Sequence, residues 1–275
     1  MGDFLFVPGA GEIKSVPGTH DEPEKGYRSH YSHDKEWASP GYYGVELIDY
    51  GVKAEMTAAS RSGFFRFTYP KSDQAFILID MNHTLWQSCP WANLRQINDS
   101  TLVGYKLVKG WGPERHVYFA ATFSCKLNNF QILQNGKPVI YDTKRFRSHL
   151  EAWGEKLMAC VRFETQANQE IYVKTAISGV STEGALRNLQ ELNGFDFDRT
   201  REAADRLWEK ELSKFQVKGD LKTKQTFYTS AYHAALHPFI FQDVDGMYRG
   251  LDKNIEKRLF LYGILIVLFI HCSIL

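Results

Sequence analysis

The chain has 275 residues, of which 33 are basic and 32 acidic, and its formal net charge is +1. This balance argues against a nucleic acid or an anionic membrane surface as the partner. A hydrophobic content of 44% excludes an intrinsically disordered chain, and an aromatic content of 14% suits a β-rich core and a sugar-binding surface equally well.

Residues 1–180 have the pattern of an antiparallel β domain. A polar segment over residues 12–40, with several prolines and glycines, predicts an extended loop. Short runs of β-branched and aromatic residues follow, separated by turns, and Asn135-Gly136 is the dipeptide of a tight hairpin turn. The segment Gln74-Ala-Phe-Ile-Leu-Ile-Asp80, apolar over residues 75–79, predicts a strand buried on both faces. The fold is therefore expected to be mainly β, a large antiparallel β-sandwich, with strands over residues 43–48, 52–57, 63–69, 74–80, 101–108, 116–123, 130–133, 139–141, 157–164 and 170–177.

From about residue 181 the spacing of apolar residues becomes helical. Ala185 and Leu189 indicate a first helix, and Asp198 is the expected cap of a second. A third is expected over residues 222–236, ended by Pro238. Three helices are too few to form a core of their own. Residues 181–252 are therefore predicted to be a helical linker and the first helices of a second domain.

The stretch Asp243–Asp252 has the composition of a ligand-facing loop, because it is polar, contains two glycines and holds three carboxylates. Its Asp-x-Asp-Gly start lacks the further acidic positions of an EF-hand calcium loop. The unresolved choice at this stage is between a sugar-binding loop and a solvated turn capped by aspartate.

Residues 253–275 form a separate segment that ends in an apolar run from residue 259 onward. The 17 residues from 259 to 275 are at the short limit for crossing a bilayer, which takes about 20 residues. Basic residues precede the run, as they do at a membrane anchor: Lys253, Lys257 and Arg258. A membrane is therefore a partner only if this tail is a real anchor.

Several segments, in order along the chain, resemble glycoside hydrolase family 92, the exo-acting α-mannosidases. They are Gly26-Tyr-Arg-Ser-His30, Asp49-Tyr-Gly-Val-Lys-Ala-Glu-Met-Thr57, Arg61-Ser-Gly-Phe-Phe-Arg-Phe-Thr-Tyr-Pro70, Gly110-Trp-Gly112, Val173-Lys-Thr-Ala-Ile-Ser178 and Asp243-Val-Asp-Gly-Met-Tyr-Arg-Gly-Leu-Asp252. The resemblance covers residues 2–252. Because it stops there, a frameshifted or read-through end explains the apolar tail better than a membrane anchor does.

The resemblance implies an N-terminal β-sandwich joined by helices to a C-terminal (α/α)6 barrel, with the active site between them. It also implies removal of α-linked mannose from glycans with inversion, a calcium ion, and export to the periplasm, the cell surface or the medium. The family's acid, base and most calcium ligands belong to the barrel, of which residues 181–252 would be an incomplete beginning. No catalytic residue and no metal ligand is therefore assigned in this chain, which is expected to be inactive by itself.

The substrate-binding candidates that the resemblance implies are Asp252, with Arg249 and Asp243, because fixed charged groups suit the recognition of vicinal hydroxyls. Trp111, between two glycines, is the best candidate for an exposed ring that stacks on a sugar. Trp86 and Trp91 are further candidates, although a tryptophan in a sandwich more often fills the core or an edge.

His30 and His33 lie three residues apart beside Asp34, a spacing that allows a metal pair. No third ligand stands at a useful spacing, so a structural role is expected for both. Three alternatives to the mannosidase fragment stay open at this stage: a stand-alone lectin-like module, a membrane-tethered structural protein, and a fragment completed by a separately encoded barrel domain.

Overall fold

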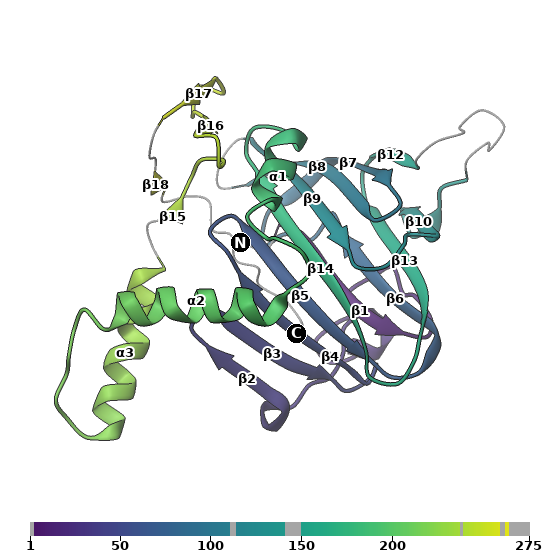
Figure 1. Cartoon of the computed structure of the whole chain (residues 1–275). Helices are drawn as coiled ribbons and strands as arrows, with labels where there is room; N and C mark the ends of the chain where they lie inside the picture. Colours follow the sequence, from purple (N-terminus) through teal and green to yellow (C-terminus); the bar gives the residue numbers. More distant parts are fainter. Residues whose placement is uncertain (1–2, 111–113, 141–149, 237–238, 259–261, 264–275) are drawn as a thin grey trace.

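The computed structural model describes residues 3–110, 114–140, 150–236, 239–258 and 262–263, and this part of the chain forms a sandwich of two antiparallel sheets (Figure 1). The larger sheet has nine strands, in the order β12 (Glu151–Gly154), β7 (Ser88–Asn98), β8 (Thr101–Lys109), β9 (Arg115–Phe123), β14 (Gln169–Ser178), β5 (Ser62–Tyr69), β4 (Val52–Ala58), β3 (Tyr42–Leu47) and β2 (Glu36–Ser39). The smaller has five, in the order β1 (Leu5–Ala10), β6 (Ser72–Asp80), β13 (Leu157–Thr165), β10 (Asn129–Gln134) and β11 (Lys137–Pro138).

The main hydrophobic core lies between the two sheets. Phe65 and Phe67 enter it from β5, and Ile77 enters it from β6. Leu78 points to the other face of β6, where Tyr27 of the long N-terminal loop covers it. The prediction that this strand is buried on both faces is confirmed, because the loop folds back over the smaller sheet.

Nine of the ten predicted strands are present, within two residues at each end. The hairpin turn is also confirmed, since Asn135 and Gly136 both have positive φ angles, 52° and 73°. The strand predicted at 139–141 is wrong for residues 139 and 140, because a two-residue turn makes pairing resume at Lys137; residue 141 lies outside the described residues. Four strands of the sandwich, β1, β2, β7 and β12, were not predicted, and β2 lies inside the segment 12–40 that was expected to be a loop. β1 and β7 each contain a proline, which cannot donate to a ladder; Pro8 lies in an edge strand and Pro90 at an irregularity of β7.

Helix α1 (Thr182–Leu189) lies on the outer face of the larger sheet, against β9 and β14 (Figure 1). The Ser181 hydroxyl caps it by accepting the Gly184 N–H at 3.0 Å. Ala185 and Leu189 pack with small residues of the sheet such as Ala120. This short helix follows β14 directly and is therefore held where the sheet ends.

Helix α2 (Phe197–Leu212) begins at Asp196, whose carboxylate accepts the Arg199 N–H at 3.0 Å. The prediction that Asp198 caps this helix is wrong. Asp198 lies in the first turn and forms an ion pair with Arg66 of β5 at 3.0 Å. The helix starts earlier than predicted because Phe197, its first residue, is buried in a cluster against the sheet.

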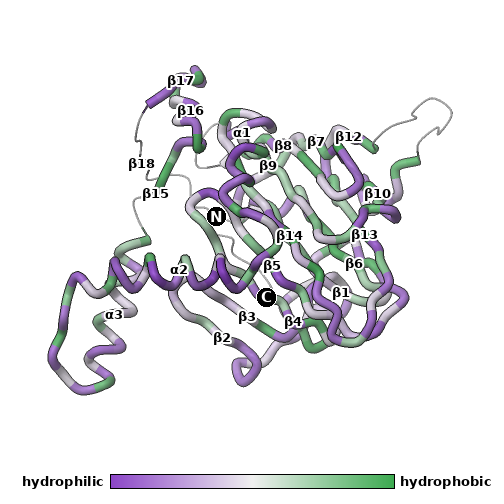
Figure 2. Tube along the Cα trace, viewed as in Figure 1, coloured by the Kyte–Doolittle hydropathy of each residue, from purple (hydrophilic) through white to green (hydrophobic). Residues whose placement is uncertain are grey.

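Helix α3 (Leu221–Ala235) extends away from the sandwich and has no buried residue. The rings of Trp208 and Tyr232, 4.6 Å apart, join it to α2. Figure 2 shows α2 coloured mostly as hydrophilic. These helices form no core of their own, as the sequence predicts.

No helix in the described part of the chain is both long and apolar enough to cross a membrane. Of the predicted tail, only residues 253–258 and 262–263 belong to the described residues. Residues Tyr262–Gly263 form β18, which pairs with β15 (Phe239–Ile240).

A buried ion pair joins β4 and β5 on the face that carries α2. The Glu55 carboxylate, with 3% of its side chain exposed, accepts two hydrogen bonds from Arg66, both at 2.9 Å, and one from the Tyr42 hydroxyl at 2.8 Å. Burial alone would raise the pKa of Glu55, but the hydrogen bonds from Arg66 and Tyr42 and the charges of Arg66 and Lys53 lower it.

Acidification is expected to destabilise the fold through Glu55. Its folded pKa lies below the unfolded one, so the stabilisation is present above the ordinary carboxyl value and is lost as the pH falls through the folded value. Thermal unfolding of wild type and of Glu55→Gln should be followed between about pH 6 and about pH 3. The variant should show a shallower fall of Tm in this range, and equal slopes would contradict the assignment.

Candidate functional site

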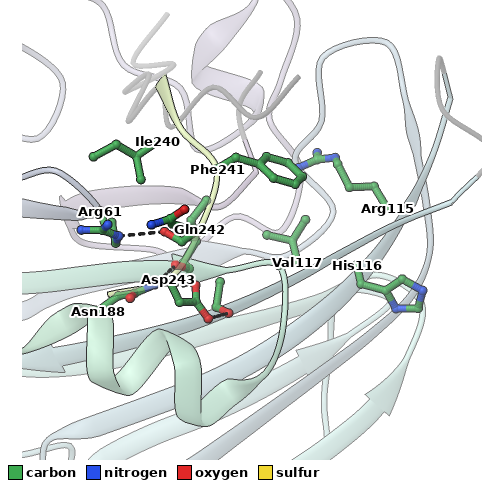
Figure 3. A pocket seen from close by; sticks show the side chains of 12 residues that line it. Arg61, Arg115, His116, Val117, Asn188, Ile240, Phe241, Gln242 and Asp243 are labelled. Carbon is green, nitrogen blue, oxygen red and sulfur yellow. Dashed lines mark hydrogen bonds between the residues drawn. The ribbon is translucent and has the colours of Figure 1, made fainter. Parts of the chain in front are cut away.

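Residues 239–258, called the docked segment here, return to the sandwich after α3. They approach the point where β14 leads into α1 (Figure 3). Within the docked segment, β16 (Met247–Arg249) pairs with β17 (Ile255–Lys257) as a short hairpin. The docked segment therefore brings the aspartate-rich loop against one end of the larger sheet.

Asp243 anchors the docked segment to the sandwich. Its carboxylate is buried and accepts hydrogen bonds from the Ser178 hydroxyl at 2.6 Å and the Asn188 amide at 2.8 Å. The Asn188 side-chain oxygen in turn accepts the Val244 N–H at 2.8 Å. Burial raises the pKa of Asp243, although the hydrogen bonds from Ser178 and Asn188 act in the opposite direction. With both oxygens bonded to the sandwich, the carboxylate has a structural position.

Arg61, at the start of β5, makes a second anchor. Its Nε donates to the Gln242 carbonyl at 2.8 Å, and its Nη1 donates to Glu191 at 2.6 Å. Glu191 also accepts the backbone N–H of Arg61 at 2.8 Å. Arg61 thus links the docked segment, the sheet and the residues after α1.

A small pocket lies between the docked segment and the ends of β9 and β14 (Figure 3). Its cavity volume of about 30 Å³ is enough for one or two water molecules. Polar and charged side chains contribute much of its lining, including Arg61, Arg115, His116, Asn188, Gln242 and Asp243. The pocket therefore lies at the contact between the docked segment and the sandwich.

The other loop candidates have different surroundings. Arg249 donates to the carbonyls of Gly179 at 2.9 Å and Val180 at 3.1 Å, so its guanidinium also ties the loop to the sandwich. Asp252 is exposed, and its carboxylate accepts hydrogen bonds from Asn254 of the same turn, at 2.8 and 3.1 Å. Of these two residues, Asp252 is the one that presents its charge to solvent.

Asp245 lies between Asp243 and Arg249 in the sequence and pairs with Arg187 at 2.9 Å, with 29% of the aspartate side chain exposed. Trp111 lies outside the described residues, so its predicted exposure stays a prediction. Trp86, in contrast, is fully exposed at 101% and has a φ angle of 61°, and Trp91 is 46% exposed. Neither ring fills the core, which is one of the two positions, core or edge, that the sequence favoured.

The histidine pair is structural in this part of the molecule. His30 bonds to Asp49 at 2.9 Å, and His33 bonds to Glu36 at 2.6 Å, so the two rings have separate carboxylate partners. Among the described residues no group of three or more His, Cys, Asp or Glu side chains is placed to hold a metal ion. The calcium ion that the resemblance implies finds no ligand set there.

Sequence reasoning missed three anchors, Arg61, Ser178 and Asn188. Arg61 begins one of the segments that resemble family 92, and Ser178 ends another. Their place in these segments could have indicated a functional role. Asn188 is a polar residue on the buried face of α1, only 1% exposed. A buried asparagine needs partners, so its position beside apolar residues was a second signal.

Gly184→Ala is expected to displace the docked segment. A Cβ at Gly184 would lie 2.3 Å from an Asp243 carboxylate oxygen and 2.6 Å from the Ser178 hydroxyl. Overpacking of this kind costs about 1–3 kcal/mol, which offsets the gain of about 1 kcal/mol from alanine in a helix. Hydrogen exchange should show faster exchange in the docked segment.

Gly179→Ala is the matched control, because nothing lies within 4 Å of a Cβ at Gly179. This variant should keep wild-type protection. Unchanged exchange in Gly184→Ala would show that the contact with Asp243 does not hold the docked segment.

The sequence matches the glycosyl hydrolase family 92 N-terminal domain over residues 1–178 and the glycosyl hydrolase family 92 catalytic domain over residues 184–265. The second match includes residues 253–265, part of the segment expected to lie outside the family. Among curated proteins no sequence matches significantly.

Comparison with solved structures also finds members of family GH92. The family GH92 α-mannosidase BT3965 from Bacteroides thetaiotaomicron is 68% identical, with a TM-score of 0.92, and the match covers 95% of this chain and 36% of that one. The same mannosidase has been solved in complex with mannoimidazole. The family GH92 inverting mannosidase BT2199 from Bacteroides thetaiotaomicron VPI-5482 shares the fold at 21% identity and a TM-score of 0.77, over 94% of this chain and 34% of its own. This chain, which spans about a third of these enzymes, belongs to glycosyl hydrolase family 92.

Proposed function

We propose that this chain is the N-terminal part of an exo-acting α-mannosidase that removes α-linked mannose from glycans with inversion. One observation carries the proposal: the chain is 68% identical, over 95% of its length, to a family GH92 α-mannosidase. The two family matches follow one another along the chain, over residues 1–178 and 184–265, so the second one includes the docked segment. The sandwich and the docked segment would together form one wall of the active site.

Within this wall, Asp252 is proposed to bond sugar hydroxyls. It is the exposed carboxylate of the loop, whereas Asp243 is bonded to the sandwich and Asp245 is paired with Arg187. Arg249 and Asp243 would then act indirectly, by fixing the loop that carries Asp252. A carboxylate held by Asn254 in a tight turn suits a directional contact with vicinal hydroxyls.

Hydrolysis with inversion needs a carboxylic acid and a carboxylate about 6.5–9.5 Å apart, one to protonate the leaving oxygen and one to activate water. In the docked segment, Asp243 is bonded to Asn188, Asp245 is paired with Arg187 and Glu256 accepts the Tyr248 hydroxyl, which leaves Asp252 and no second carboxylate without such a partner from outside its own turn. We therefore place the acid, the base and the calcium ligands in the remaining part of the catalytic domain. The chain by itself is expected to be inactive.

Co-expression tests this proposal. The chain should be produced with and without the part of the 68%-identical mannosidase that lies beyond its match, and both preparations assayed on an aryl α-mannoside. Activity is expected only with both parts, with β-mannose as the first product by NMR. Hydrolysis by the chain alone, or none by a stable complex, would contradict the proposal.

Two variants test the proposed role of Asp252 in the reconstituted enzyme. Asp252→Asn should raise KM and lower kcat/KM about tenfold or more, because a charged hydrogen bond to the sugar is lost. Asn254→Ala is the control, since it removes a bond within the turn but keeps the carboxylate. Binding without hydrolysis in every preparation would favour the lectin-like alternative.

A further inference from the structure

The outer face of the larger sheet carries exposed aromatic rings at the end far from α2. On β7, Ala92 and Leu94 belong to the core, so strand alternation points Trp91 and Asn93 outward. On β12, Ala152 belongs to the core, so Trp153 points outward as well. Trp91 is 46% exposed and Trp153 is 56% exposed, which leaves much of each indole open to solvent.

These rings continue across the sheet as a row. Trp153 pairs with Asn93, Asn93 with Tyr105, and Tyr105 with Tyr118, in the strand order β12, β7, β8 and β9 (Figure 1). The rings of Tyr105 and Tyr118 are 4.8 Å apart. The next row contains Trp91 and His116, and the His116 ring stacks on Tyr105 at 5.8 Å. We call Trp91, Trp153, Tyr105, Tyr118 and His116 the aromatic strip.

The aromatic strip ends at the candidate site. Tyr118 pairs with Ser178, which donates to Asp243. In the neighbouring row, the His116 ring lies 3.0 Å from Glu114, and Glu114 is 2.8 Å from the ammonium group of Lys253, the residue after Asp252. The strip is thus continuous with the docked segment and runs from there to the free edge of the sheet.

We propose that the aromatic strip binds the pyranose rings of a glycan chain, so that a substrate of several sugar units lies along it and is led toward Asp252. This inference rests on the proposed function and adds a binding surface for the part of the glycan that lies beyond the mannose to be removed. The flat rings suit the C–H face of a pyranose. Trp153 and Tyr105 lie two strands apart, about 10 Å, a spacing that suits a disaccharide.

Polar groups also lie along the strip. The partly exposed Glu151 carboxylate accepts a hydrogen bond from the buried Asn93 amide at 3.0 Å, and the Tyr105 hydroxyl bonds His116 at 2.9 Å. The core of a protein–protein interface is depleted in such charged groups. Two open indole rings beside half-buried tyrosine and histidine rings and a partly exposed carboxylate therefore favour a carbohydrate over a protein partner.

The chain should be labelled with ¹⁵N and titrated with an α-linked mannopentaose while its tryptophan indole N–H signals are followed by NMR. Saturable shifts are expected at Trp91 and Trp153. Trp153→Ala and Trp91→Ala should each weaken binding roughly 3- to 10-fold, whereas Trp91→Phe should keep most of it because a flat ring remains. Trp37→Ala is the matched control, because Trp37 is 44% exposed on β2, the opposite edge strand of the same sheet.

Shifts that do not saturate, that appear equally at Trp37, or that persist unchanged in both alanine variants would overturn the proposal. So would displacement of the sugar when the remaining catalytic domain is added, since the strip would then be a domain interface. Failure of the proposed function would give a different result. The aromatic strip would still bind the pentaose, but the reconstituted preparation would hydrolyse no mannoside.

Discussion

Arg66→Ala is expected to lower the free energy of unfolding by about 3–5 kcal/mol, because it leaves the Glu55 carboxylate buried without its main partner. Arg66 makes two hydrogen bonds to Glu55, forms an ion pair with Asp198 of α2, and lies 4.5 Å from the Phe197 ring centroid. One substitution therefore weakens both the sheet and its contact with α2. Urea denaturation followed by circular dichroism measures the loss, with the m-value as a check on two-state unfolding.

Two control variants test whether the unpaired Glu55 carboxylate causes this loss of stability. The double variant Glu55→Leu/Arg66→Met should lose less stability than Arg66→Ala, because no charge is left buried. Glu170→Ala removes a carboxylate that is 4.0 Å from Arg66 and 41% exposed, and should cost less than about 1 kcal/mol. If the double variant lost as much as Arg66→Ala, an unpaired Glu55 would not be the reason.

Asp243→Ala is expected to release the docked segment at a local cost of about 2–3 kcal/mol. The Ser178 hydroxyl and the Asn188 amide would both lose an acceptor in a buried place. Hydrogen exchange by mass spectrometry should show faster exchange over residues 240–258 and unchanged protection in the core strands. In the reconstituted enzyme, the same variant should lower kcat/KM, because Asp252 would no longer be fixed.

Asp245→Ala is the matched control for this prediction. It removes a carboxylate two residues away whose pairing with Arg187 is partly exposed, and such pairs contribute less than about 1 kcal/mol. Equal loss of protection in the two variants would mean that total loop charge, and not the buried contact of Asp243, holds the docked segment.

The sandwich was predictable because strand alternation is a local property. Phe65 and Phe67 have the period of two that points them to one face, and the apolar run at 75–79 has the composition of a strand covered on both faces. The start of α2 was predicted wrongly because two nearby residues could each cap the helix. Asp196 and Asp198 are both sound caps, and the burial of Phe197 decides between them.

The sequence predicted which stretch of the chain carries the candidate site, but it did not predict how its side chains are oriented. The sequence by itself determined the sandwich, the three helices, the position of an aspartate-rich loop at Asp243–Asp252 and the resemblance to family 92. Tertiary structure alone decided that Asp243 and Arg249 face the sandwich while Asp252 faces solvent. The reason is that their partners, Ser178, Asn188 and the carbonyl of Gly179, lie 55 to 70 residues away in the chain, and no local pattern encodes such contacts.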